Sequence, residues 1–322
     1  MMELRDVKKY YPVHGGIFQR RRGVVKAVDD VSLSIHEGET LALVGESGCG
    51  KSTLGRLIVR LDKPHAGSIL FEGADVQAQT EGPLKNYCRQ VQLIFQDPYA
   101  SLNPRRSAGD IIAEPLLIHA SDSGKARKHA VAALMRTVGL NEEQMYRYPH
   151  EFSGGQRQRI GIARAIALKP KLIVADEPVS ALDVSIQAQI LNLLKDLQTQ
   201  FGLTYLFITH DLSVVRHMGD RVAVMYLGKI VELAGNDDLF LKPLHPYTQA
   251  LLSAVPIADP GREKKGRIVL AGDVPSPLDS PLGCAFHPRC AYRFDPCDKI
   301  EPFLECHGPN RQVACHLVAR SC

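Results

Sequence analysis

Eight residues near the amino terminus have the types and spacing of a phosphate-binding loop. They read Gly45-Glu46-Ser47-Gly48-Cys49-Gly50-Lys51-Ser52, and Thr53 follows them. The glycines would let backbone N–H groups approach phosphate oxygens, and the start of a helix adds partial positive charge. Lys51 would reach the β- and γ-phosphates and the Ser52 hydroxyl would bind Mg²⁺. The alternative, a chance glycine turn, does not account for the strand predicted before the segment and the helix predicted after it.

Two adjacent carboxylates follow a short apolar run further along the chain. Residues 172–175 (LIVA) predict a buried strand, and Asp176 and Glu177 come directly after it. A Mg²⁺-nucleotide site needs an acidic residue at such a position, so Asp176 would hold the hydration shell of the metal. Glu177 would orient or deprotonate the attacking water. An ordinary solvated turn is the alternative, but Pro178 fixes the backbone directly behind the pair.

A second segment could bind an anion. Ser153-Gly154-Gly155-Gln156 opens a predicted helix, with a serine able to cap it and two glycines that expose N–H groups. The chain would thus carry two half-sites for phosphate. The phosphate loop and the carboxylates alone leave a kinase, a GTPase and a transport motor open. A GTPase switch would lack its guanine-reading N-K-x-D motif here and would not explain the second segment.

Alternating strands and helices must position these segments. Apolar patterns predict strands at 4–9, 27–35, 40–44, 91–95, 172–175 and 204–208, the first of them at a sheet edge. A helix is expected to begin near Lys51, and a mostly helical region is expected over 111–168. A further helix over 185–200 would lie between two of the strands. That order is a βαβ unit, which implies a parallel, buried sheet.

Taken together, the motifs resemble those of the ATP-binding-cassette (ABC) ATPases, in family order over residues 1 to about 235. The matching positions are the signature loop (Ser153 to Gln156), the Q-loop glutamine Gln96, the D-loop (Ser180-Ala181-Leu182-Asp183), the switch histidine His210 and the adenine-stacking aromatic Tyr11. The resemblance implies an α/β fold: a P-loop, RecA-like core with an antiparallel β subdomain and a helical subdomain at about 97–165. Residues 236–322 would form a small, loop-rich C-terminal domain.

Residue roles follow from this resemblance. It implies that His210 contacts the γ-phosphate, that Gln96 senses Mg²⁺ and water, and that Asp183 communicates across a dimer. Each ATP would be held between the phosphate loop of one subunit and the signature loop of another, so a partner is required. Only the spacing of all the motifs along the chain, which matches that of the family, distinguishes Gln96 from an ordinary surface amide and His210 from an ordinary histidine. Tyr11 is the least specific assignment, since Tyr10 could serve instead.

The tail resembles the C-terminal extension of ATPases that serve dipeptide, oligopeptide and nickel importers. The similarity rests on His245 to Pro256 (HPYTQALLSAVP), Gly272 to Pro277 (GDVPSP) and Gly283 to Cys290 (GCAFHPRC), and is closest to the F-type subunits of dipeptide transporters. The resemblance implies ATP-driven import of di- or oligopeptides. A nickel importer of the same family is an alternative. A soluble, non-transport ABC ATPase is another, although such chains usually carry two cassettes or a long coiled coil.

Such importers pair this subunit with a homologous D-type ATPase, and a homodimer could form in isolation. Two membrane permeases and, indirectly, an extracytoplasmic peptide-binding protein complete the assembly. The resemblance places the chain at the cytoplasmic face of the membrane as a peripheral subunit. The region around Gln96 and the helical subdomain would dock the permeases.

Six of the eight cysteines lie between Cys284 and Cys322. Successive cysteines are separated by 5, 6, 8, 8 and 6 residues, wider than the gaps of about two to four that zinc sites prefer. An iron–sulfur cluster tolerates wider spacing. The related ATPases carry Cys284, Cys290, Cys297 and Cys315 in matching positions and include members with a [4Fe–4S] cluster there, whereas Cys306 and Cys322 have no counterpart. Free or disulfide-linked thiols without metal are the alternative.

The composition limits the number of domains and the classes of protein to which the chain could belong. The 322 residues, 45% of them hydrophobic and 23% charged, suffice for about two globular domains. The net charge of +4, from 39 basic and 35 acidic residues, is too small to argue for a nucleic-acid partner. No apolar run reaches the length of about 18 residues that a membrane span needs. Because Met1 to Asp6 carries charges where a signal peptide would be apolar, we expect a cytosolic chain.

Overall fold

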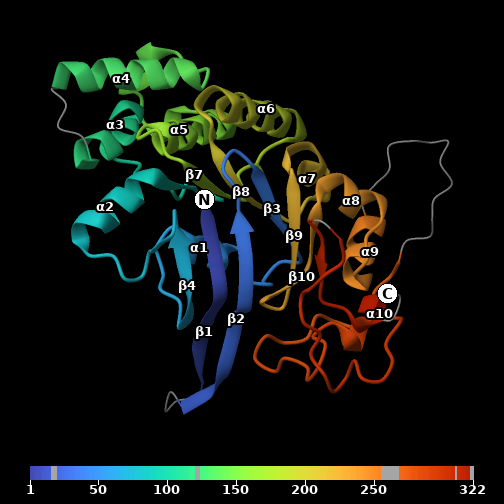
Figure 1. Ribbon diagram of the computed structural model, residues 1–322. Helices are drawn as coiled ribbons and strands as arrows, with labels where there is room; N and C mark the ends of the chain where they lie inside the picture. Colours follow the sequence, from blue (N-terminus) through green and yellow to red (C-terminus); the bar gives the residue numbers. More distant parts are fainter. Residues whose placement is uncertain (16–19, 120–123, 255–267, 309, 320–322) are drawn as a thin grey trace, which may run out of the picture.

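Two sheets with helices packed around them form the part of the chain that the computed structural model describes, residues 1–15, 20–119, 124–254, 268–308 and 310–319 (Figure 1). The larger sheet has the strand order β11-β12-β10-β9-β3-β8-β7-β6. Its strands are β3 (Thr40–Val44), β6 (Val91–Ile94), β7 (Leu172–Asp176), β8 (Thr204–Thr209), β9 (Arg221–Tyr226), β10 (Lys229–Gly235), β11 (Glu305–Cys306) and β12 (Gln312–Val313).

The centre of this sheet is parallel and buried on both faces. Strands β7 and β8 pair in parallel and are joined by α6 (Val184–Phe201), which confirms the predicted βαβ unit. Side chains alternate between two cores: Ile173 and Tyr205 lie in one, and Val174 and Leu206 lie in the other. Burial on both faces explains why these strands read as continuous apolar runs.

The smaller sheet is antiparallel, with the order β2-β1-β4-β5. Its strands are β1 (Met2–Gly15), β2 (Arg20–Ile35), β4 (Ala66–Phe71) and β5 (Ala74–Asp75). The prediction of an edge strand at 4–9 is wrong, because β1 lies between β2 and β4. Leu4 and Val7 are buried while Glu3 and Arg5 are exposed. That mixed pattern reflects a sheet with one solvated face, not a free edge.

Helices cover the larger sheet, and three of them form the predicted helical region (Figure 1). They are α3 (Ala108–His119), α4 (Gly124–Thr137) and α5 (Gly154–Ile166), with two short 3₁₀ turns between α4 and α5. The others are α1 (Lys51–Ile58), α2 (Glu81–Gln90), α7 (Leu212–Met218), α8 (Asn236–Leu241), α9 (Pro246–Ser253) and α10 (His316–Ala319). Among the described residues, no helix combines the length and apolar character needed to cross a bilayer.

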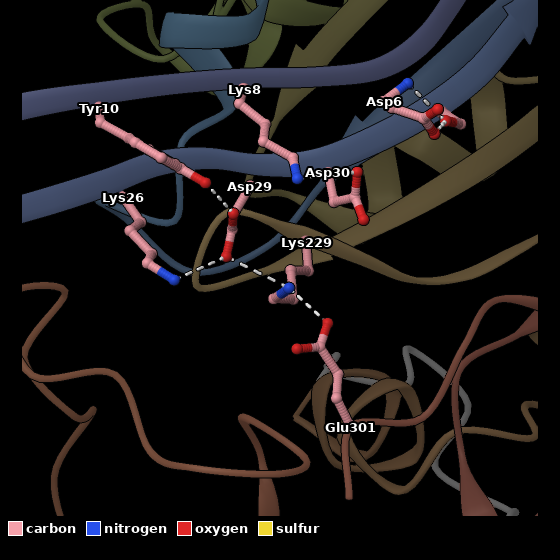
Figure 2. A network of polar contacts seen from close by, with 9 residues as sticks. Asp6, Lys8, Tyr10, Lys26, Asp29, Asp30, Lys229 and Glu301 are labelled. Atoms are coloured by element: carbon pink, nitrogen blue, oxygen red, sulfur yellow. Dashed lines mark hydrogen bonds and ion pairs between the residues drawn. The ribbon is translucent and has the colours of Figure 1, made fainter. Parts of the chain in front are cut away.

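An ion network fastens the antiparallel sheet to β10 and the C-terminal segment (Figure 2). Asp29 accepts a hydrogen bond from the Tyr10 hydroxyl at 2.5 Å and from Lys26 at 3.4 Å, and pairs with Lys229 at 3.2 Å. Lys229 also pairs with Glu301. Burial raises the pKa of Asp29, but the Tyr10 hydroxyl and the Lys229 ammonium outweigh it and hold that pKa below its usual value. Asp29 thus joins β1 and β2 to Lys229 of β10, and Lys229 extends the network to Glu301 of the C-terminal segment.

A buried carboxylate fastens the tail itself. Glu232 of β10 is fully buried and accepts hydrogen bonds from the N–H groups of Leu244 at 3.0 Å and His245 at 2.9 Å. The Arg311 guanidinium pairs with the same carboxylate at 2.7 Å. Val313 of β12 lies opposite Glu232 in the sheet. The tail is thus joined to β10 through both backbone pairing and a buried ion pair.

We expect Glu232→Ala to lower the free energy of unfolding by about 3–5 kcal/mol, because it leaves the Arg311 guanidinium without its buried carboxylate partner and two backbone N–H groups without an acceptor. Urea unfolding followed by circular dichroism measures the change. The exposed Glu305 on β11 offers a matched control, and Glu305→Ala should change stability by less than about 0.5 kcal/mol. Equal effects of the two substitutions would contradict this role for Glu232.

Candidate functional site

The predicted site residues follow strands that end at one edge of the larger sheet. Strands β3, β8, β7 and β6 are neighbours and parallel, so their carboxyl ends lie side by side. The residues that leave these ends are the phosphate loop after β3, His210 after β8, Asp176 and Glu177 at the end of β7, and Gln96 after β6. Segments more than 150 residues apart in sequence therefore converge.

Close backbone packing shapes the phosphate loop. A Cβ atom at Gly45 would lie 2.1 Å from the Met225 carbonyl oxygen, and one at Gly50 would lie 1.9 Å from the Ala27 carbonyl oxygen. Both glycines also have positive φ, +156° and +110°. Only glycine satisfies both conditions. The loop consequently lies against β9 and β2 and leads directly into α1, the order of elements that a phosphate cradle requires.

Lys51 is buried and points back into this loop. Its ammonium donates to the carbonyl oxygens of Gly45 at 2.8 Å and Glu46 at 3.0 Å. The side chain is 5% exposed, so its charge is held within the loop. This is where the β- and γ-phosphates of a nucleotide would need a counter-charge.

Ser52 and Asp176 provide a pair of oxygen ligands. The Ser52 hydroxyl donates to the Asp176 carboxylate at 2.9 Å. Burial raises the pKa of Asp176, and the hydrogen bond from Ser52 only partly offsets that effect. A half-buried carboxylate beside a hydroxyl is a donor set that Mg²⁺ accepts, and the charge of the ion would relieve the cost of burial. The residues present therefore fit a Mg²⁺-nucleotide.

Glu177 lies at the centre of a three-residue group. Its carboxylate accepts a hydrogen bond from the Gln96 amide at 2.8 Å and lies 3.0 Å from His210 Nδ1. The backbone of Glu177 has φ of +46°, a region costly for a residue other than glycine. Its N–H donates to the Ile208 carbonyl at 2.9 Å, which holds this conformation. The structure thus brings together three residues that the sequence placed far apart.

The signature segment starts a helix and is accessible. Ser153 caps α5: its hydroxyl accepts from the Gln156 N–H at 3.3 Å, while its own N–H donates to the Gln156 side chain at 3.0 Å. Ser153 and Gly154 are exposed, but the preceding Phe152 is buried as a core anchor. Helix α5 packs against the helices α3, α4 and α6 and against β6. Strand β6 is the last strand of the larger sheet, three positions from β3, which precedes the phosphate loop.

The D-loop packs against the signature segment of the same chain. A Cβ atom at Gly154 would lie 3.3 Å from Leu182 Cδ2 of the D-loop, and one at Gly155 would lie 2.5 Å from Ile186 Cγ2 on α6, so the glycines allow these segments to touch. Asp183 precedes α6 at its N-cap position and is exposed. Its side chain is therefore available to another molecule.

Tyr11 lies on β1 and contacts the segment that follows α1. Its hydroxyl donates to Asp62 at 2.6 Å, and the Lys9 ammonium lies 5.1 Å from the ring centroid. Burial raises the pKa of Tyr11 to about 12, the Asp62 carboxylate adds to the rise, and a hydrogen bond with Thr53 opposes it. The hydroxyl of Tyr11 is therefore bonded to the segment that follows α1. Tyr10 instead bonds to Asp29, in the network of Figure 2.

Four cysteines of the tail line a single small pocket. Cys284, Cys290, Cys297 and Cys315 lie there with Phe286. Burial raises the pKa of Cys284 to about 11, and its three thiol neighbours contribute to the rise. In the described residues, no group of three or more His, Cys, Asp and Glu side chains is arranged to hold a metal ion. Cys306 is exposed and outside this pocket, and Cys322 lies outside the described residues.

Two tail residues that were not predicted as part of the site contact the phosphate loop. The Glu46 N–H donates to the Tyr247 hydroxyl, and the Arg289 guanidinium binds the Glu46 carboxylate. Both lie in the motifs by which the tail resembles importer ATPases. Their spacing gave no sign of what they contact, because more than 200 residues separate them from the loop.

The chain is similar to known transport proteins over nearly its whole length. Residues 28–180 match the family described as ABC transporter, and residues 231–297 match the C-terminal region of oligopeptide/dipeptide transporters. The oligopeptide transport ATP-binding protein AppF of Bacillus subtilis (strain 168) is 57% identical over 319 residues, 98% of this chain and 97% of AppF. The dipeptide transport ATP-binding protein DppF of Escherichia coli (strain K12) is 51% identical over 318 residues, 99% of this chain and 94% of DppF.

A solved structure shares the fold. The dimeric, post-hydrolysis ATP-binding cassette MJ0796 bound to ADP and Pi superposes with a TM-score of 0.65 at 31% identity, over 73% of this chain and 99% of that one. The resemblance to ABC ATPases and the predicted cassette fold are thereby confirmed. The chain belongs to the ATP-binding proteins of ABC transporters, within the oligopeptide and dipeptide transport family.

Proposed function

We propose that this chain is the ATP-hydrolysing subunit that powers import of di- or oligopeptides through an ABC transporter. The observation that carries the proposal is the meeting of the phosphate loop, the Ser52–Asp176 pair and the Gln96–Glu177–His210 group at one sheet edge. The tail supports peptides as cargo, since it matches the C-terminal region of oligopeptide/dipeptide transporters. The names of AppF and DppF favour peptides over nickel as well.

The geometry suggests how the residues divide the work. Bound Mg²⁺-ATP would supply the phosphoanhydride bond and the metal charge. Loop N–H groups and Lys51 would bind the phosphates, with Ser52 and Asp176 as oxygen donors toward Mg²⁺. Glu177 would accept the proton of the attacking water. Gln96 and His210, which contact the Glu177 carboxylate, would hold that carboxylate in position. The backbone strain at Glu177 fits a carboxylate fixed for chemistry.

A second cassette would complete each ATP site. Ser153 and Gly154 are exposed at the start of α5, and Asp183 is exposed before α6, which packs against α5. Both features support a dimer in which these segments face the nucleotide of the partner. The partner would be a homologous ATPase, or a second copy of this chain in isolation. Closure with ATP and release after hydrolysis would then follow from γ-phosphate contacts present only in the closed form.

The assembly would include two permeases in the membrane and, indirectly, an extracytoplasmic peptide-binding protein. This chain would lie on the cytoplasmic face as a peripheral subunit. The helices α3 and α4 and the region around Gln96 would form the docking surface for the permeases. The division at about residue 235 between an ATPase domain and a C-terminal extension belongs to the same proposal.

The four cysteines that share a pocket would hold a [4Fe–4S] cluster. Four thiols around one apolar pocket are a suitable donor set for such a cluster, whose ligands lie farther apart than those of a single zinc ion. The cluster would act as a structural staple in a segment with few core residues.

We expect Glu177→Gln to reduce ATP hydrolysis by the assembled transporter about 10²- to 10⁴-fold while Mg²⁺-ATP binding is retained, because an amide cannot accept the proton. Phosphate release and nucleotide binding measure the two effects. Glu305→Gln, at an exposed position, should leave both unchanged. Undiminished hydrolysis by the Glu177 variant would refute its assignment.

Cells that carry Lys51→Ala should lose uptake of labelled di- and oligopeptides, because the phosphate loop loses its counter-charge. The control is Lys299→Ala, which removes an exposed lysine of the tail. If Lys51→Ala abolished uptake of labelled nickel and spared peptides, nickel would be the cargo. If neither uptake changed and the chain co-purified with ribosomes or DNA, the import function itself would be wrong.

Anaerobically purified chain should contain about four iron atoms and four acid-labile sulfides. Cys297→Ser should lower both contents sharply, because the cluster loses a thiolate. Cys306→Ser provides the control, since this exposed cysteine lies outside the pocket, and its iron content should match that of the unaltered chain. Zinc, or no metal, in the unaltered protein would exclude the cluster.

A further inference from the structure

The C-terminal tail holds the phosphate loop at Glu46. The Glu46 N–H donates to the Tyr247 hydroxyl at 2.9 Å, and its carboxylate accepts two hydrogen bonds from Arg289, at 2.9 and 3.3 Å. Tyr247 is fully buried, and the side chain of Arg289 is 9% exposed. These contacts are therefore largely shielded from water, where a forked guanidinium–carboxylate pair is both directional and strong.

Glu46 connects the tail to the lysine of the ATP site. Its N–H binds Tyr247 on one side, while its carbonyl oxygen accepts from the Lys51 ammonium at 3.0 Å on the other. The phosphate-loop pattern leaves this position free, so its side chain can serve a different purpose. A shift of Glu46 would move the lysine and the neighbouring N–H groups together.

Both tail contacts border the pocket of the four cysteines. Arg289 directly precedes Cys290 in the chain. Phe286 lines the cysteine pocket and packs on Tyr247, with ring centroids 5.4 Å apart. Helix α9, which carries Tyr247, is fixed at its start because the N–H of its N-cap residue His245 donates to the Glu232 carboxylate. An ordered cysteine segment thus holds Arg289 and Tyr247 where they meet Glu46.

We propose that Arg289 and Tyr247 are positioning residues for the phosphate loop, and that through them nucleotide affinity depends on the order of the cysteine-bearing tail. Fixing the loop before nucleotide binds lowers the entropy lost on binding. Arg289 also neutralises a carboxylate that would otherwise stand uncompensated beside the phosphates. The tail becomes part of the ATP site without touching the nucleotide.

The test measures the dissociation constant of the non-hydrolysable analogue Mg²⁺-AMP-PNP for the full chain by calorimetry. Arg289→Gln should raise it about tenfold and Tyr247→Phe about fivefold, the losses typical of a charged and a neutral hydrogen bond. Arg289→Lys should give an intermediate value, because one donor replaces the fork. Lys299→Gln removes a charge elsewhere on the tail and should leave the constant unchanged.

A double-mutant cycle distinguishes positioning of the phosphate loop by Arg289 from a general loss of stability. Glu46→Gln should change the dissociation constant less in the Arg289→Gln chain than in the unaltered chain, because the contact is already lost. Each variant should remain folded at the temperature of the calorimetry, and its metal content should stay at the value of the Lys299→Gln control. Affinity that falls only in step with stability, or effects of the two substitutions that simply add, would overturn the proposal.

The dependence of nucleotide affinity on the cysteines rests on the proposed cluster and is tested by a separate experiment. Cys297→Ser should weaken Mg²⁺-AMP-PNP binding in the unaltered chain and have little further effect in the Arg289→Gln, Tyr247→Phe chain. If metal analysis finds no iron while Arg289→Gln still weakens binding, the cluster fails and the positioning role stands. If iron is present but Arg289→Gln binds the analogue normally, the positioning role fails and the cluster stands.

Discussion

The parallel register of four adjacent strands is the constraint on which the site depends. Val44 pairs with Thr209, Ile208 with Asp176, and Ala175 with Ile94, so the strands end nearly level. Neighbouring strands are about 4.8 Å apart, which brings loops from four parts of the chain within reach of one nucleotide. Because the strands end nearly level, Ser52 on α1 can contact Asp176 across the intervening strand β8. A register slip of one residue would reverse the side chains and disperse the site.

Backbone contacts also keep the phosphate loop in place. The turn from β9 to β10 has positive φ at Leu227 and Gly228, as a two-residue hairpin requires. The Gly228 N–H donates to the Cys49 carbonyl at 2.9 Å, and the Gly228 carbonyl accepts from the Asp29 N–H at 2.9 Å. This hairpin therefore connects the phosphate loop to β2. The close approach explains why glycines recur here: side chains would force the three segments apart.

The sequence predicted local structure and chemistry better than long-range partners. The strand at 40–44 and the helix starting at Lys51 are as expected, because apolar periodicity and glycine spacing are local signals. The position of β1 inside its sheet was not predicted, since alternation shows which face is buried but not how many neighbours a strand has. The contacts that Tyr247 and Arg289 make with Glu46 were missed for a related reason. A tyrosine and an arginine in a proline-rich tail carry no local sign of a loop 200 residues away.

The tail illustrates how a segment poor in core residues can still be held firmly. Its strands β11 and β12 are two residues each, too short to be stable alone, so pairing with β10 must be reinforced. The buried Glu232–Arg311 pair supplies part of that reinforcement, and the rings of Tyr226, Tyr247 and Phe286 supply another part by packing together. A buried ion pair adds geometric definition more than net stability, because desolvation offsets much of its attraction. A well-defined geometry is what the tail needs if its role is to direct the Arg289 guanidinium toward the phosphate loop.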